Sequence, residues 1–153
     1  MTTATAQGTG TITRGRARTG TGARPAPLPR SVTALLADAG RSLGRSIAAQ
    51  QPADRFAAAH LAALRGAAAV LATRARPRRA ARGSAWELLP RVAPELAEWA
   101  AFFAAGSGKR QAASAGVPVR ISAREADDMV RQASAFLDVV DQVLGTAGPD
   151  RLV

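Results

Sequence analysis

The chain is predicted to be all-helical, and three observations carry this prediction. Alanine, the strongest helix former, occurs 38 times among the 153 residues. Apolar residues recur at helical spacing in several segments, and no long run of β-branched or aromatic residues indicates a strand. The length suits one domain with tails. Only 34 residues are Val, Ile, Leu, Met, Phe or Trp, so the helices must approach closely to bury a core.

The first helix is expected over residues 32–49, with Ser31 as its N-cap. An apolar stripe at helical period predicts this helix, and Gly40 and Gly44 within it would let a neighbouring helix approach closely. The stripe consists of Val32, Leu35, Leu36, Ala39, Leu43 and Ile47.

The second helix is expected over 52–75, because proline is favoured at a first helical position and Asp54 suits the positive end of the helix dipole. Its main apolar face includes Phe56, His60 and Leu64. Alanines also populate the opposite side, so this helix is expected at the centre of a bundle or at a dimer contact.

Two capping boxes mark the starts of later helices. Ser84 and Glu87 predict a short helix over 85–92, and Ser122 and Glu125 predict a last helix over 123–144. Gly145 would stop the last helix in a left-handed cap.

Between these two helices, a third main helix is expected from Pro94 to about Ala105, where the Gly-Ser-Gly at 106–108 ends or bends it. Residues 106–121 are expected to form a loop, with a helical turn at 109–115. The four main helices most simply form an antiparallel bundle over 31–145. A disordered tail over 1–30 precedes it and a short tail over 146–153 follows.

The net charge of +10 is concentrated in two segments without acidic residues, the tail over 1–30 and a basic loop over 74–83. Such runs are typical of phosphate contact. The alternative is a passive, solvated role, because the excess of arginine over lysine also fits a GC-rich genome. The candidate nucleic-acid-binding residues are Arg74, Arg76, Arg78, Arg79, Arg82, Lys109, Arg110 and Arg120.

The absence of cysteine excludes disulfides and thiolate metal sites, and a single histidine leaves no metal site to expect. No cofactor is expected. The start of the chain lacks the apolar core of a secretory signal, and no segment approaches an uninterrupted apolar span of about 20 residues. A cytoplasmic protein with no membrane partner is the expectation.

Three segments in order carry a resemblance to a known family: FAAAHLAALRGAAAVLA, VAPELAEWAAFFAAG and SAREADDMVRQASAFLDVVDQVL. Together they resemble HEPN domains (higher eukaryote and prokaryote nucleotide-binding), in particular a small stand-alone branch from high-GC bacteria. The resemblance covers about 31–145. It implies a four-helix up-and-down bundle that often forms homodimers. It also implies either a metal-independent ribonuclease of toxin or defence systems, or a non-catalytic module that binds RNA, an antitoxin or a nucleotidyltransferase.

Catalytic members of the superfamily carry Arg-x(4–6)-His near the start of the last helix, and this chain departs from that pattern. Arg124 begins its last helix and no histidine follows; the spacing occurs only as Arg55 and His60, on the second helix. Positions five apart lie about 140° apart around a helix, so the two would not meet within one subunit. In a symmetric dimer, His60 from one chain would act as general acid or base and Arg55 from another would stabilise phosphorane charge. Alternatively, His60 simply packs beside Phe56 and Leu64.

Three functions follow from these observations. The preferred one is a non-catalytic HEPN module that binds RNA, a nucleotide or a protein partner. The second is a metal-independent ribonuclease that uses Arg55 and His60. The third is a helical scaffold whose basic tail contacts nucleic acid without specificity.

Overall fold

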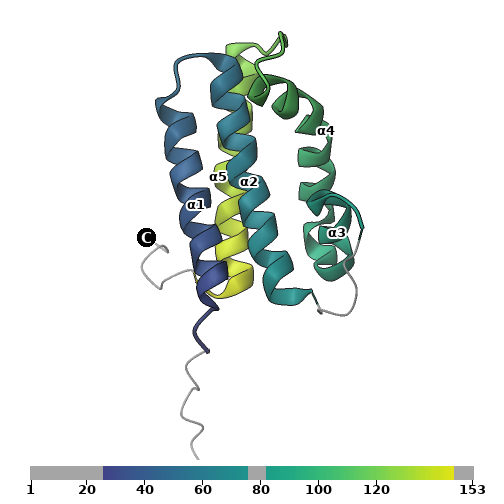
Figure 1. Ribbon diagram of the computed structural model, residues 1–153. Helices are drawn as coiled ribbons and strands as arrows, with labels where there is room; N and C mark the ends of the chain where they lie inside the picture. Colours follow the sequence, from purple (N-terminus) through teal and green to yellow (C-terminus); the bar gives the residue numbers. More distant parts are fainter. Residues whose placement is uncertain (1–25, 76–81, 147–153) are drawn as a thin grey trace, which may run out of the picture.

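The computed structural model describes residues 26–75 and 82–146, which form an upright bundle of helices (Figure 1). The four long helices alternate in direction along the chain. No strand occurs in the described residues, so the all-helical class is confirmed, while a short helix makes a fifth beside the four long ones. The helices are α1 (Arg30–Ala48), α2 (Pro52–Arg74), α3 (Ala85–Val92), α4 (Ala97–Ser114) and α5 (Ala123–Leu144), with a 3-10 turn over Pro94–Leu96 before α4.

Helix α2 occupies the centre of the bundle and packs against α1, α3, α4 and α5. This confirms the central position expected from alanines on both of its sides. The small side chains of α2 let the surrounding helices approach closely, and most of the large buried side chains lie on α3, α4 and α5. The fully buried alanines of α2 are Ala59, Ala62, Ala63, Ala67 and Ala69.

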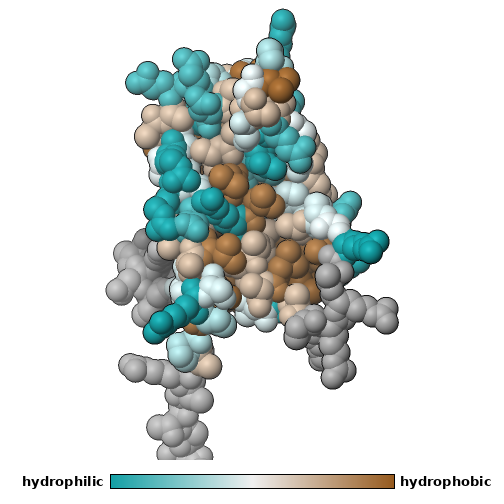
Figure 2. All heavy atoms as spheres, viewed as in Figure 1, coloured by the Kyte–Doolittle hydropathy of each residue, from teal (hydrophilic) through white to brown (hydrophobic). Residues whose placement is uncertain are grey.

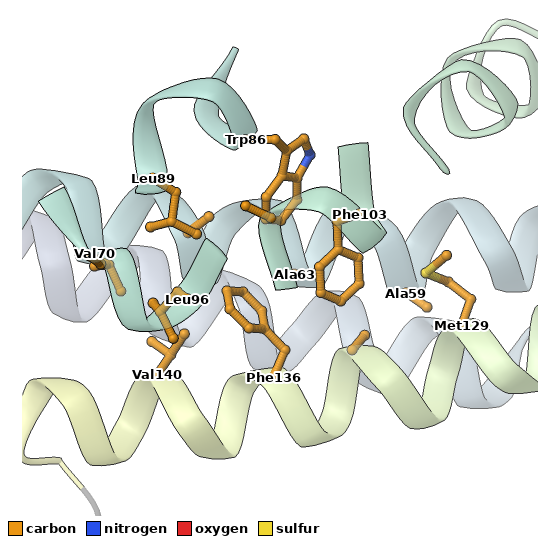
Figure 3. Packing of buried hydrophobic residues seen from close by; sticks show 14 of the residues in the cluster. Ala59, Ala63, Val70, Trp86, Leu89, Leu96, Phe103, Met129, Phe136 and Val140 are labelled. Atoms are coloured by element: carbon orange, nitrogen blue, oxygen red, sulfur yellow. The ribbon is translucent and has the colours of Figure 1, made fainter. Parts of the chain in front are cut away.

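An aromatic cluster fills the space between α2, α4 and α5, as Figure 3 shows. Phe103 of α4 lies at its centre, with ring centroids 5.0 Å from Trp86 and 5.2 Å from Phe136. Trp99 stacks on the same ring at 6.2 Å. These rings are among the largest side chains of a core that is otherwise built from alanine together with Phe56, Val70, Leu89, Leu96, Met129 and Val140.

Helices α3 and α5 begin at the predicted residues, Ala85 and Ala123. Local side chains cap both starts. The Ser84 hydroxyl accepts a hydrogen bond from the Glu87 amide, and the Glu87 carboxylate accepts one from the Ser84 amide. At the start of α5 the Ser122 hydroxyl accepts a hydrogen bond from the Glu125 amide, but the Glu125 carboxylate pairs with Lys109 instead, so only half of the capping box predicted there is formed. Helix α5 ends as expected at Gly145, whose φ of 69° lies in the left-handed region.

The expected N-cap of α1 is wrong. The helix begins at Arg30, and Ser31 makes no capping bond. The carbonyl of Pro29 accepts the first helical bonds, from the amides of Val32 and Thr33. Arg30, the last residue of the tail predicted over 1–30, is thus helical, and residues 1–25 lie outside the described part of the chain.

The end predicted for the third main helix is also wrong, because α4 continues through 106–108 to Ser114. Gly106 is buried against α2 and α5, where a Cβ atom would lie 3.3 Å from both His60 Cδ2 and Met129 Cε. The close approach that this glycine permits gives packing that offsets its weak helix propensity. The helical turn expected at 109–115 is the last part of α4.

The glycines that allow close helix contact differ from the ones expected. A Cβ atom at Gly40 or Gly44 would meet no atom within 4 Å, so neither residue of α1 admits a neighbouring helix. Gly66 of α2 does so instead, because a Cβ atom there would lie 2.6 Å from Leu137 Cδ2 of α5.

Replacing both Gly40 and Gly44 by alanine is expected to raise the free energy of unfolding by about 1 kcal/mol per site, because alanine favours the helix and meets no obstacle. Urea denaturation followed by circular dichroism would measure this gain. Gly66→Ala is the matched control, and it should give no comparable gain because Leu137 must move aside. A double variant no more stable than the wild type would contradict the assignment of an open surface at α1.

Candidate functional site

His60, the single histidine, is sealed inside the bundle with 0% of its surface exposed. Three aromatic rings surround it. Phe56 stacks on the imidazole at a centroid distance of 6.4 Å, while Trp86 and Phe103 meet it edge-on at 5.8 Å each. The position of His60 on an apolar helical stripe accounts for this burial.

The imidazole makes one hydrogen bond, from Nε2 to the backbone carbonyl oxygen of Phe103 at 2.7 Å. A carbonyl can only accept, so Nε2 carries a proton, while Nδ1 has no hydrogen-bond partner among the described residues. Burial lowers the pKa of His60 below its ordinary value of 6.5. The Phe103 carbonyl opposes this shift, and the positive charge of Arg110 adds to it. His60 is therefore neutral at neutral pH.

Arg55 lies at the first turn of α2 and joins three elements. Its Nη1 donates to the Asp127 carboxylate of α5 at 2.5 Å. Its Nε donates to the carbonyl of Ala49 at 3.2 Å and its Nη2 to the carbonyl of Ile47 at 3.4 Å, both at the C-terminal end of α1. All three nitrogens of the guanidinium thus have partners within the protomer.

The structure does not bring Arg55 and His60 together in the described part of the chain. Arg55 faces Asp127 and the end of α1, whereas His60 faces Phe103 and the core. A small hollow of about 200 Å³ lies beside Arg55 and Asp127, and His60 does not line it. The angular argument from their spacing along the helix led to the same separation.

The predicted basic residues differ in how far their charge is available. Arg74, at the end of α2, pairs with Glu95 at 2.5 Å, and Lys109 of α4 pairs with Glu125 of α5. Arg110 is half-buried, and its Nε has no hydrogen-bond partner within residues 26–75 and 82–146. Arg82 and Arg120 are exposed. The remaining predicted residues, Arg76, Arg78 and Arg79, lie outside the described residues.

A groove between α4 and α5 was not foreseen. It has a volume of about 320 Å³, and Phe102, 41% exposed, separates it from a second hollow beside Trp99 and Gln132. Carboxylates of Glu125 and Asp128 line one side of it. The signal available in the sequence was Phe102 itself, which lies next to Phe103 and so cannot share its inward direction on a helix.

A polar cluster between α1 and α2 was also missed. Ser42 of α1 is buried, and Arg45 and Arg65 both donate to its hydroxyl oxygen. The serine and Arg45 are three residues apart on one helix, which was a weak local signal. Nothing in the sequence places Arg65 beside them.

The described residues contain no group of three or more His, Cys, Asp or Glu side chains that could hold a metal ion. Helix α2 is long and apolar enough by length and composition to cross a membrane, whereas the expectation concerned an uninterrupted apolar segment of about 20 residues, which Arg55 and Arg65 break in this helix. Half of its most apolar window is buried inside the bundle, however, and a core helix passes the same test. Its contacts with all four other helices are those of a core helix.

Antiparallel long helices around a central alanine-rich helix agree with the architecture that the HEPN resemblance implies. A family model described as SAV_6107-like HEPN matches residues 46–141, from the end of α1 to the last turn of α5. The match covers more than half of the chain, which therefore belongs to this HEPN family. No curated protein and no solved structure gives a significant match.

Proposed function

We propose that this protein is a non-catalytic HEPN module that binds RNA without cleaving it. The observation that carries the proposal is the sealing of His60 within the aromatic core. Membership of the HEPN family supports a nucleotide-related role in general. The net charge of +10 favours a polyanionic ligand over a basic or neutral one.

Metal-independent cleavage of RNA needs a group that takes a proton from the ribose 2′-hydroxyl within hydrogen-bond distance. His60 is fully buried, so the substrate cannot reach its imidazole without opening the bundle. RNA cleavage also needs a cation to stabilise the negative charge that develops on the phosphate in the transition state. Arg55 already neutralises Asp127 and caps the end of α1. Neither predicted catalytic residue is free for the reaction in this arrangement.

The test is incubation of the full chain with a mixed-sequence, single-stranded RNA in EDTA, with cleavage and binding measured on the same samples. The expected result is no cleavage, together with binding that weakens steeply as salt rises. Metal-independent cleavage that disappears in a folded His60→Ala variant would overturn the proposal in favour of the ribonuclease.

A variant lacking residues 1–25 separates this function from that of a passive scaffold. The module should retain part of its RNA affinity without the tail, whereas loss of all binding would assign the contact to the tail alone. Absence of binding by the wild type would favour a protein partner. In that case the groove beside the exposed Phe102 is the first surface to examine.

A further inference from the structure

Two arginines from different helices converge on one buried serine between α1 and α2. The hydroxyl oxygen of Ser42, a residue with 0% exposure, accepts hydrogen bonds from Arg45 Nη2 and Arg65 Nη1, each at 2.9 Å. Two nitrogens at this distance from a single oxygen are separated by at most twice that distance. The guanidinium groups of Arg45 and Arg65 therefore lie close enough for one phosphate group to contact both.

No carboxylate of the described residues neutralises this pair of cations. Among residues 26–75 and 82–146, neither Arg45 nor Arg65 has an acidic group within ion-pair distance. The nearby Asp38 carboxylate pairs with Arg41, while its backbone carbonyl lies 3.5 Å from Arg65 Nη1. Two like charges held at one neutral oxygen repel each other, so an anion placed between them would be stabilised by both.

Helix stabilisation explains only half of this arrangement. Arg45 lies in the last turn of α1, where a cation interacts favourably with the helix dipole. Arg65 lies in the middle of α2 and has no such role. Arg45 is exposed and Arg65 is half-buried, so the pair is accessible from one side and anchored from the other. Figure 2 shows hydrophilic side chains gathered over α1 on the face viewed.

We propose that Arg45 and Arg65, positioned by Ser42, bind one phosphate group of a single-stranded RNA backbone. The phosphate oxygens accept hydrogen bonds from the guanidinium N–H groups that point away from the serine. This inference rests on the proposed function for its ligand, RNA. A free phosphate offers the same chemistry, and the experiment below distinguishes the two sources.

The test compares two double variants of the full chain that lose the same net charge. Arg45→Gln with Arg65→Gln removes the unpaired cations. Arg41→Gln with Arg131→Gln, the matched control, removes two arginines that already pair with Asp38 and Asp128. Affinity for a fluorescent oligouridylate should fall about tenfold in the first and less than about twofold in the second. The slope of log K against log salt should fall by about 0.7 in the first only.

Ser42→Ala keeps both charges and removes their shared anchor. It should weaken RNA binding about threefold, because the two side chains lose their fixed positions. Thermal unfolding by circular dichroism verifies that each variant is folded. Equal affinities of the two double variants would overturn the phosphate site and leave the proposed RNA function intact.

Titration of the wild type with inorganic phosphate provides the second arm, read from the Nε–H signals of assigned arginines by NMR. Shifts at Arg45 and Arg65, together with the loss of RNA affinity, support the inference. Shifts at the pair without any RNA binding by the wild type would overturn the RNA ligand and assign the site to a free phosphate. If the wild type shows neither phosphate-induced shifts at Arg45 and Arg65 nor binding to RNA, both the site and the proposed function are overturned.

Discussion

Phe103→Ala is expected to lower the free energy of unfolding by about 3–5 kcal/mol, a large part of the stability of an ordinary domain. Phe103 is fully buried, and its ring contacts Trp86, Trp99 and Phe136. The rings that surround Phe103 are rigid, and the alanines of the same core have no atoms beyond Cβ with which to fill the cavity. Urea denaturation followed by tryptophan fluorescence would measure the loss.

Phe102→Ala is the matched control for this prediction, since the two phenylalanines are adjacent on α4. Phe102 is 41% exposed and contributes less buried area, so its loss should lower stability by about 1 kcal/mol or less. Similar losses in both variants would mean that the ring of Phe103 is not the centre of the core. His60 donates its hydrogen bond to the backbone carbonyl of residue 103, so the Phe103→Ala variant still has the acceptor of that bond.

Stability is expected to fall as the pH drops below about 6.5, by up to about 1.4 kcal/mol per pH unit. Burial lowers the pKa of His60 in the folded state, while the unfolded chain keeps the ordinary value of 6.5. Between these two pKa values only the unfolded state takes up the proton. The stabilisation is therefore complete above pH 6.5 and declines as the pH falls towards the folded pKa. Urea denaturation at a series of pH values would measure this dependence.

His60→Leu isolates the contribution of the imidazole, because leucine is of similar size and cannot be protonated. This variant should show little change in stability between pH 6.5 and 5.5, above the range in which most carboxylates titrate. His60 is the single histidine of the chain, so no second imidazole contributes in this window. A slope in the variant equal to that of the wild type would contradict a neutral, buried His60.

The helices that the sequence predicted best are those with local signals at their ends. Ser84, Ser122 and Gly145 each form the cap that their neighbours in sequence allow. Helix α4 was predicted too short because Gly106 and Gly108 have poor helix propensity. The contact that compensates, between Gly106 and the side chains of His60 and Met129, joins residues far apart in the chain and leaves no local signal.

The candidate site shows the same division between local and distant information. Spacing along α2 correctly placed His60 on an apolar face and away from Arg55. The partners of these residues were not predictable, because Asp127 lies 72 residues from Arg55 and Phe103 lies 43 residues from His60. The convergence of Arg45 and Arg65 likewise depends on how α1 and α2 pack, which no single segment specifies.

The alanine-built centre of α2 has an evolutionary consequence. Most core positions can lose volume by mutation, but fully buried alanines such as Ala59, Ala63 and Ala67 can lose only a methyl group. Nearly every substitution at these sites adds atoms to a space already filled, and overpacking commonly costs about 1–3 kcal/mol. One base change converts an alanine codon to valine. We therefore expect sequence drift in this lineage to spare the central helix and to accumulate on the outer faces of α4 and α5 and on the exposed face of α1 away from Ser42 and Arg45.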